Sequence, residues 1–292
     1  MIPSKRLGHL DQVALASDRE VLDVHVYRGI EIRIHPTRGF DVGGAWFRGF
    51  PLAWISNAGE GGAPGRDWRR AWGGGLVTTC GLDNVGAPSE GVGLHGTYTF
   101  LVARDVEVLR GEDAVICTAT ILDPRGLQVE RRIATSLGHG RLEVVDRVEN
   151  VTAAPLEAPL LYHVNIGWPV WDEGAVVKSD AGEIVPRDED AAPFSAGEAP
   201  RPASAPERVW EHVGATRAEI VNDRIGVSVR VTSNLPRLWQ WVDPSPGVYA
   251  FALEPANCSV LGRAHDRAEG RLPVLEPLEQ RETRLTIEAE VA

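Results

Sequence analysis

The sequence predicts an all-β protein built as a large antiparallel β-sandwich. Hydrophobic and polar residues alternate over many short segments, and Gly, Pro or Asp–Gly pairs separate many of these segments. Successive side chains of a strand point to opposite faces, so this alternation indicates strands with one buried face. No segment has a helical stripe of apolar residues longer than a turn or two. Many strands without intervening helices favour an antiparallel sandwich over a βαβ fold.

The alternation is clearest near the two ends of the chain, at 22–26, 30–34, 225–231 and 285–291. Further strand-like runs occur at 97–109, 114–122, 127–134, 141–149, 158–166, 237–243 and 248–254. Because strands come from both ends and no hydrophilic linker divides them, we expect a single domain spanning 1–292. A sandwich of this size as one domain is common.

Charge and composition narrow the class of partner. The 292 residues include 41 acidic and 30 basic side chains, which give a formal net charge of −11. Such a surface repels phosphate backbones and anionic lipid, so neither nucleic acid nor a membrane is an expected partner. A small neutral or weakly charged ligand fits better. An exposed edge strand could also support a homodimer.

Cysteine usage and the N-terminus predict a cytoplasmic protein. The chain has three widely spaced cysteines, Cys80, Cys117 and Cys258. Their odd number and spacing favour reduced, buried thiols over disulfides, and they form no metal-ligand pattern. The N-terminal segment lacks the apolar core of a signal peptide, and no stretch approaches the roughly 18 apolar residues of a membrane helix.

Two segments read as long loops. Residues 57–75 combine many glycines with Trp68 and Trp72, and this mixture of flexible backbone and flat aromatic surface suits a lid over a ligand. Residues 186–206 are rich in Pro and Ala and polar. We interpret the second segment as a surface excursion and not as a binding element.

Three polar side chains interrupt apolar strands. His163 and Asn165 lie in a segment otherwise made of Leu, Tyr, Val and Ile, and Glu254 ends another apolar segment just before a proline. A carboxylate or an imidazole in such a setting must be desolvated or hydrogen-bonded, which shifts its pKa. Such placements are enriched at catalytic sites, although a lone core histidine or a paired strand-end carboxylate is the alternative.

Five short motifs occur in order along nearly the whole chain. They are Arg38–Asp41, Gly74–Asn84, His95–Gly96, Leu161–Gly167 and Leu253–Asn257. In these motifs the sequence resembles the galactose mutarotase/aldose 1-epimerase superfamily, and most closely its uncharacterised bacterial aldose-epimerase-like branch, of DUF4432 type. Each motif is weak alone, but five in order are specific.

The resemblance implies a galactose mutarotase-like supersandwich with a sugar lying across a concave sheet face. By motif position, Glu254 would remove the proton of the anomeric hydroxyl and His163 would protonate the ring oxygen. His95 would be the second histidine, and Arg38 would bind a hydroxyl by looser analogy. Glutamate is ordinarily ionised at pH 7, whereas histidine can hold a proton near neutrality. Two such groups suffice for ring opening, so no metal or other cofactor is expected.

Further residues in these segments are candidates for substrate binding: Asp41, Asp83, Asn84, Asn165, Trp72, Gln240 and Trp241. Each has a structural alternative. Arg38 and Asp41 could form an ion pair that braces a turn, and Asp83 with Asn84 could provide turn chemistry. The tryptophans could belong to the core, but aromatic rings also stack well on the C–H faces of a pyranose.

Two features bear on the charge of the sugar and leave it open. Relatives in this branch show a Q-W-K-like segment where this chain has Gln240-Trp241-Val242, which weakens the case for an anionic sugar. Conversely, Arg66, Arg69 and Arg70 could bind a phosphate or carboxylate, or could form a solvated loop face.

The sequence therefore predicts a carbohydrate-active isomerase, of aldose 1-epimerase (mutarotase) type, acting on a small-molecule sugar. One alternative is a protein that binds or senses sugar without turnover. Another is an isomerase, epimerase or lyase acting at another carbon of a uronate or ketose, which rests on analogy of fold alone.

Overall fold

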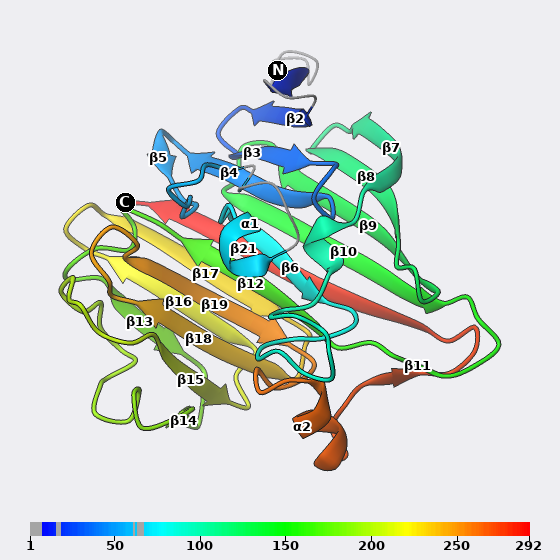
Figure 1. The fold of residues 1–292 in the computed structure, drawn as a ribbon. Coiled ribbons are helices and arrows are strands. Elements are labelled where there is room, and N and C mark those ends of the chain that lie inside the picture. Colours follow the sequence, from blue (N-terminus) through cyan, green and yellow to red (C-terminus); the bar gives the residue numbers. More distant parts are fainter. Residues whose placement is uncertain (1–7, 16–18, 61, 63–66) are drawn as a thin grey trace.

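Two large antiparallel sheets stack into a sandwich, which confirms the predicted all-β class (Figure 1). The structure is a computed structural model that describes residues 8–15, 19–60, 62 and 67–292. A further pair of short strands, β11 (Leu156–Glu157) and β20 (Val274–Leu275), lies near the C-terminal helix. The chain thus builds its layers from strands, as the period-two alternation predicts.

The larger sheet has 11 strands. Its spatial order is β1 (Gly8–Leu15), β2 (Arg19–Val26), β3 (Ile30–His35), β4 (Asp41–Phe47), β6 (Val77–Gly81), β12 (Leu160–Ile166), β19 (Ala250–Ala256), β18 (Arg237–Asp243), β15 (Arg208–Val213) and β14 (Glu183–Pro186), with β5 (Phe50–Pro51) paired to β4. The middle strands β6, β12 and β19 come from distant parts of the chain, and each overlaps one of the sequence motifs.

The second sheet has eight strands. Its order is β13 (Val176–Ser179), β16 (Arg217–Asn222), β17 (Val227–Ser233), β21 (Gln280–Val291), β10 (Arg141–Asn150), β9 (Leu127–Ser136), β8 (Ala114–Leu122) and β7 (Ala103–Arg110). The C-terminal strand β21 is longer than the alternating segment predicted at 285–291, because its first residues alternate weakly but still pair with β10.

Helices are short and lie outside the sheets. They are α1 (Trp68–Ala71), α2 (Arg263–Ala268) and the 3₁₀ turn η2 (Tyr98–Phe100). Asp67 caps α1, since its side chain accepts a hydrogen bond from the backbone N–H of Arg69. No helix among the described residues combines the length and apolar composition that crossing a bilayer requires.

Apolar side chains of the two sheets meet in a continuous core. Ile34 of the larger sheet and Ile121 of the second sheet are both fully buried there. At one end of this core, Trp171 packs on Phe251 with ring centroids 4.2 Å apart. Burying such side chains contributes about 1.5–3 kcal/mol each, so the face that each strand turns inward is strongly determined.

A buried polar cluster joins the two sheets inside this core. Arg131 of β9 forms ion pairs with Asp146 of β10 at 2.6 Å and with Asp41 of β4 at 2.7 Å. Arg131 also donates to the hydroxyl of Thr79 in β6. The guanidinium is 1% exposed, so both carboxylates are compensated without water.

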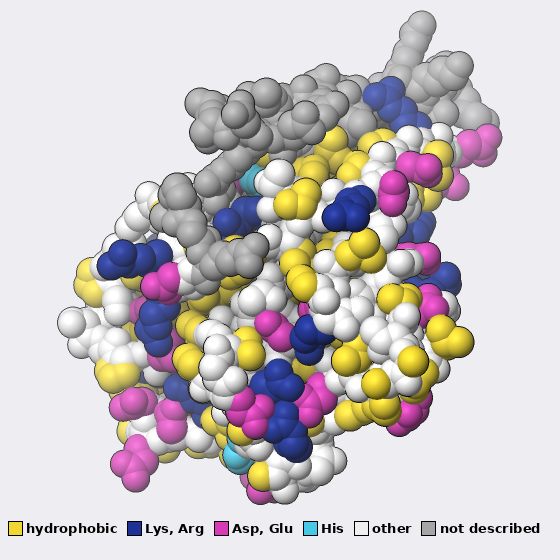
Figure 2. Space-filling view, turned by 45° about the vertical axis from the view of Figure 1, so that its right-hand side comes forward, with side chains coloured by type: hydrophobic (Ala, Val, Ile, Leu, Met, Phe, Trp, Pro, Cys, Tyr) yellow, Lys and Arg dark blue, Asp and Glu magenta, His cyan; other side chains and the backbone are white. Residues whose placement is uncertain are grey.

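Acidic and basic side chains are interspersed on the surface. On the face shown in Figure 2, as far as described residues cover it, both signs are scattered among polar and apolar side chains. The second sheet contributes cross-strand ion pairs such as Arg284–Glu143, at 2.6 Å. Exposed pairs of this kind add little stability, about 0–1 kcal/mol each.

Candidate functional site

His163 and Glu254 are cross-strand neighbours in the middle of the larger sheet. β12 and β19 pair antiparallel with Leu161 opposite Ala256 and Val164 opposite Leu253, a register that sets His163 opposite Glu254. The Nε2 atom of His163 lies 2.8 Å from Oε1 of Glu254. Both residues are only 3% exposed. A charge-assisted hydrogen bond of this length holds the two side chains together.

The alternation of β12 explains why this pair faces away from the main core. Tyr162 and Val164 point between the two sheets and belong to the core. His163 lies between them in sequence and therefore points to the other face of the sheet. A smaller apolar cluster covers that face and includes Leu161, Cys80 and Trp239. The pair is thus surrounded by apolar side chains on the outer face of the larger sheet.

Aromatic rings enclose the imidazole of His163. Its ring centroid lies 5.0 Å from that of Trp72 and 5.5 Å from that of Trp241. Within the described ranges, the Nδ1 atom of His163 is buried without a hydrogen-bond partner. Leaving a buried polar atom unpaired costs about 1–3 kcal/mol, so the packing around His163 holds this nitrogen at a cost in stability.

His95 reaches the same place from a loop between β6 and η2. Its ring lies edge-on to that of His163, with centroids 5.7 Å apart, and packs against Trp68 at 4.9 Å. The backbone of His95 is left-handed, with φ of 56°, a conformation that costs a non-glycine residue about 1–2 kcal/mol. Hydrogen bonds on both sides hold it: its N–H donates to Gly86 and its carbonyl accepts from Gly81.

His95 is a neutral imidazole at physiological pH. Burial, reinforced by the neighbouring His163, lowers the pKa of His95 to about 3. Its Nδ1 atom accepts a hydrogen bond from the N–H of Gly86 at 3.4 Å. A neutral ring that accepts at Nδ1 has its proton at Nε2. His95 can therefore donate a hydrogen bond to a ligand oxygen.

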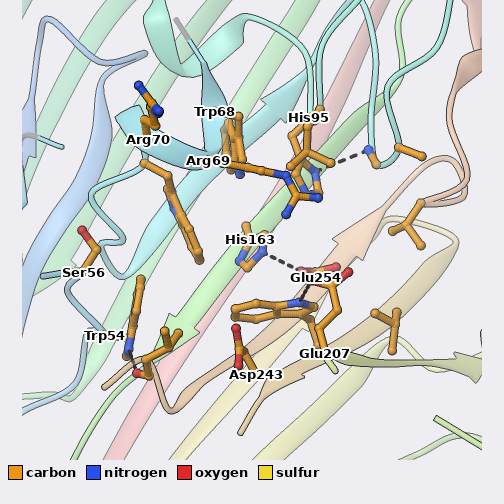
Figure 3. A pocket seen from close by; sticks show the side chains of 18 of the residues that line it. Trp54, Ser56, Trp68, Arg69, Arg70, His95, His163, Glu207, Asp243 and Glu254 are labelled. Carbon is orange, nitrogen blue, oxygen red and sulfur yellow. Dashed lines mark hydrogen bonds and ion pairs between the residues drawn. The ribbon is translucent and has the colours of Figure 1, made fainter. Parts of the chain in front are cut away.

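These side chains line a cavity of about 710 Å³ on the outer face of the larger sheet. Tryptophans form much of its wall: Trp54, Trp68, Trp72 and Trp241. Trp72 is packed between Trp54 and Trp68, with ring centroids 4.9 Å and 5.9 Å away. Figure 3 shows the rings arranged around His163, with the hydrogen bond to Glu254 at the base of the space between them. The volume falls in the range of small-molecule sites, about 300–1,000 Å³.

Charged side chains lie around the cavity in two groups. Arg69 and Arg70 come from α1. Arg187, Glu207 and Asp243 lie on the opposite side, with Arg187 near the start of the 186–206 segment and Glu207 directly after its end. The Oε2 atom of Glu207 accepts a 3.0 Å hydrogen bond from the indole of Trp241, which fixes the orientation of that ring.

Some of the predicted site residues line the cavity and others lie outside it. His95, His163, Glu254, Trp72 and Trp241 line the cavity. Six others that the sequence suggested do not line it, beginning with Asn165 and Gln240. The side chain of Asn165 donates to the carbonyl oxygens of Gly75 and His163, and so braces the backbone of β12. Gln240 precedes Trp241 and therefore points to the opposite face, where its Oε1 atom accepts a 2.9 Å hydrogen bond from Nε2 of His212.

Arg38 and Asp41 also lie away from the cavity. Arg38 donates to the carbonyl of Ala71 at 2.7 Å and so braces the C-terminal end of α1. Asp41 accepts hydrogen bonds from the N–H and hydroxyl of Thr79 and from Arg131. Burial raises the pKa of Asp41, an effect that Arg131 opposes. In this arrangement both residues act on the framework behind the site.

Asp83 and Asn84 organise the loop that presents His95. Asp83 accepts hydrogen bonds from the backbone N–H groups of Asn84 and Thr97. The amide of Asn84 donates to the carbonyls of Ala87 and Gly93, and its oxygen accepts from the N–H of Arg263 in α2. Turn chemistry is thus the role that these contacts support, with the loop and its histidine held from both ends.

Sequence reasoning missed part of the cavity wall. Arg187, Glu207 and Val209 line it; Arg187 lies within the 186–206 segment, for which the sequence predicts a surface excursion and not a binding element, and Glu207 and Val209 lie directly after that segment. Their nearness to β15 (Arg208–Val213) was the only signal for a place in the cavity wall. Using it requires knowing the position of β15 in the sheet. The predicted lid at 57–75 does contribute Asn57, Trp68 and Arg69 to the wall, whereas Arg66 lies outside the described residues.

Comparison with known structures agrees with this architecture. A proposed aldose 1-epimerase from Klebsiella pneumoniae superposes with a TM-score of 0.88 at 20% identity, covering 99% of this chain and 86% of that one. Galactose 1-epimerase from Lactobacillus acidophilus gives 0.67 at 14% identity over 98% and 99% of the two chains. A galactose mutarotase-like protein from Clostridium acetobutylicum gives 0.67 at 12% over 98% and 100%. At these identities the likeness establishes the fold.

Comparison of sequences identifies the family. No curated protein matches the chain. The family described as a domain of unknown function, DUF4432, matches residues 17–289, which is nearly the whole sequence. The chain therefore belongs to the DUF4432 family and has the β-sandwich fold of galactose mutarotase-like proteins.

Proposed function

We propose that the protein is a carbohydrate isomerase of aldose 1-epimerase type. The observation on which this rests is the buried imidazole–carboxylate pair, His163 and Glu254, with Nε2 and Oε1 2.8 Å apart on the wall of the tryptophan-lined cavity. The names of the structural relatives from Lactobacillus and Klebsiella point to the same reaction. A cyclic hemiacetal presents two oxygens, O1 and O5, on one carbon, which matches the small separation of the two groups.

In this proposal the pair moves two protons in one event. The Glu254 carboxylate removes the proton from the anomeric hydroxyl while His163 delivers a proton to the ring oxygen. The C1–O5 bond breaks and the C1 carbonyl forms. Rotation about C1–C2 exposes the other carbonyl face, and the reverse transfers close the ring as the other anomer. A positioned acid and base typically contribute about 10²–10⁴-fold each.

The other cavity residues have supporting roles in the proposal. His95 is neutral because its pKa is lowered to about 3, so it binds a hydroxyl through its Nε2 proton without competing as an acid. Trp72 and Trp241 line the same space, and aromatic side chains there suit the apolar C–H face of a pyranose.

Anomer exchange measured by NMR across a panel of aldoses and ketoses tests the proposal. We expect saturation transfer between α and β signals of at least one sugar, abolished by Glu254→Gln. Binding of a sugar without exchange would instead identify a sensing protein. A new ketose or an unsaturated product would indicate chemistry at another carbon, and unchanged exchange in Glu254→Gln would remove the assigned base.

A further inference from the structure

Two arginines of the cavity wall are without a counter-charge. Arg69 and Arg70 line the cavity from α1, and both are exposed at its opening. Across residues 8–15, 19–60, 62 and 67–292, no carboxylate lies within ion-pair distance of either guanidinium, and neither side chain donates a hydrogen bond. Many other arginines among the described residues do form ion pairs with glutamate or aspartate, for example Arg230 with Glu219 and Arg284 with Glu143.

The other charged groups of the cavity already have partners. Arg187 pairs with Asp188 at 2.6 Å and with Glu207 at 3.5 Å. Glu207 also accepts from the indole of Trp241, and the Oδ1 atom of Asp243 accepts from the N–H of Ser245 at 2.9 Å. On the side of α1, the charge that lines the cavity is therefore positive, in a chain whose net charge is −11.

The two arginines point in different directions. Figure 3 shows Arg69 extending from α1 across the cavity toward His95 and Glu254, whereas Arg70 turns away from them. Arg69 is close enough to His95 to contribute to the lowered pKa of that histidine. The guanidinium of Arg69 thus lies over the same space as the His163–Glu254 pair and is free to bind a ligand group there.

We propose that the ligand of this cavity is a sugar with an anionic substituent, a phosphate monoester or a carboxylate, bound by Arg69. The inference rests on the proposed function for the sugar itself and adds the substrate class. A guanidinium presents a planar fork of donors that matches both anions in a bidentate way. The volume of about 710 Å³ leaves room for a monosaccharide with the substituent.

Matched ligand pairs test the substrate class through binding. Quenching of tryptophan fluorescence is suitable because four tryptophans line the cavity. The panel compares glucose with glucose 6-phosphate and galactose with galacturonate, and includes inorganic phosphate alone. We expect the anionic member of at least one pair to bind tenfold or more tightly than its neutral partner. The phosphate and carboxylate arms then distinguish the two sources of the anion.

The variant Arg69→Gln identifies the residue. It should weaken binding of the preferred anionic sugar at least tenfold and leave the neutral partner within about twofold. Arg110→Gln, an exposed arginine on β7 remote from the cavity, removes the same charge and should change neither affinity. Equal affinities within both pairs, or a preference retained in Arg69→Gln, would overturn the inference.

Anomer exchange, measured in parallel, separates this inference from the proposed function. Arg69-dependent binding of an anionic sugar without exchange would contradict the epimerase assignment and support the anion site. Neutral sugars that exchange as fast as anionic ones, in both wild type and Arg69→Gln, would contradict the anion site alone. Failure of every sugar to bind would contradict both.

Discussion

The hydroxyl of Tyr162 donates a 2.7 Å hydrogen bond to Asp146 across the interior of the sandwich. Tyr162 belongs to β12 of the larger sheet and Asp146 to β10 of the second sheet. The next residue in β12, His163, points to the outer face and into the cavity. The buried polar cluster around Arg131 therefore fixes the strand that presents the imidazole, and links the stability of the core to the geometry of the site.

Removal of Arg131 should destabilise the protein strongly. In Arg131→Met, Asp41 and Asp146 lose the cation that compensates them, and breaking a buried pair of this kind costs about 3–5 kcal/mol. We expect this loss in the free energy of unfolding measured with urea. Arg132→Gln is the matched control, since Arg132 is the next residue of β9 and its side chain is 40% exposed. Its cost should stay below about 1 kcal/mol, and similar losses in the two variants would contradict the assigned role.

Substitution of either member of the His163–Glu254 pair should abolish most of the exchange activity. Glu254→Gln and His163→Asn are each expected to lower the rate of anomer exchange by about 10²–10⁴-fold. Because the two groups are in contact and act as a unit, the double variant should be little worse than the poorer single variant. Multiplicative losses would show that they act independently.

The control for this experiment is Glu211→Gln. Glu211 lies opposite Trp239, which lies opposite Glu254, so the change removes a carboxylate from the same row of the sheet outside the cavity wall. Its exchange rate should remain within about twofold of wild type. Circular dichroism spectra of all variants should coincide.

Burial of neutral His95 predicts a pH-dependent stability. Its pKa is about 3 in the folded protein against an ordinary value of 6.5. Between these values the unfolded chain binds a proton that the folded chain does not, so stability falls as pH decreases from about 6.5 toward 3. The slope contributed by this group approaches about 1.4 kcal/mol per pH unit. Urea unfolding at pH 7 and pH 5 measures it.

In His95→Gln the dependence on pH should become shallower but should persist. His212 has a pKa lowered mainly by burial, so it contributes a slope of the same sign. His139→Gln, at an exposed position, should follow the wild-type dependence. A wild-type slope retained in His95→Gln would contradict the buried neutral imidazole.

Substitutions of the adjacent residues Gln240 and Trp241 should affect different properties, stability in the first case and sugar affinity in the second. Gln240→Leu leaves the carbonyl of Ala196 and the Nε2 atom of His212 without the partner that Gln240 provides, which should cost about 1–3 kcal/mol of stability with the sugar affinity unchanged. Trp241→Phe removes the indole that contacts Glu207 and lines the cavity. We expect a several-fold loss of sugar affinity by fluorescence titration. The reverse pattern would contradict the assignment of faces.

Local periodicity was sufficient to predict the class of fold. Alternation at 114–122 or 141–149 identifies strands because a side chain two residues on returns to the same face, whatever the rest of the chain does. The same local contrast singled out His163, Asn165 and Glu254, since polar groups are costly inside apolar strands. The order of the motifs then indicated the family, which the DUF4432 match confirms.

Only the tertiary structure decided which of these residues lie together in the cavity. The register that brings His163 opposite Glu254, 91 positions away, depends on the order of strands in the sheet. Asp41 and Asn84 acquired framework contacts, and Arg187 and Glu207 joined the cavity wall, because chain segments distant in sequence pack beside them. Strand pairing over such separations is selected by the burial of whole faces and by loop closure, and neither quantity is encoded in any short stretch of sequence.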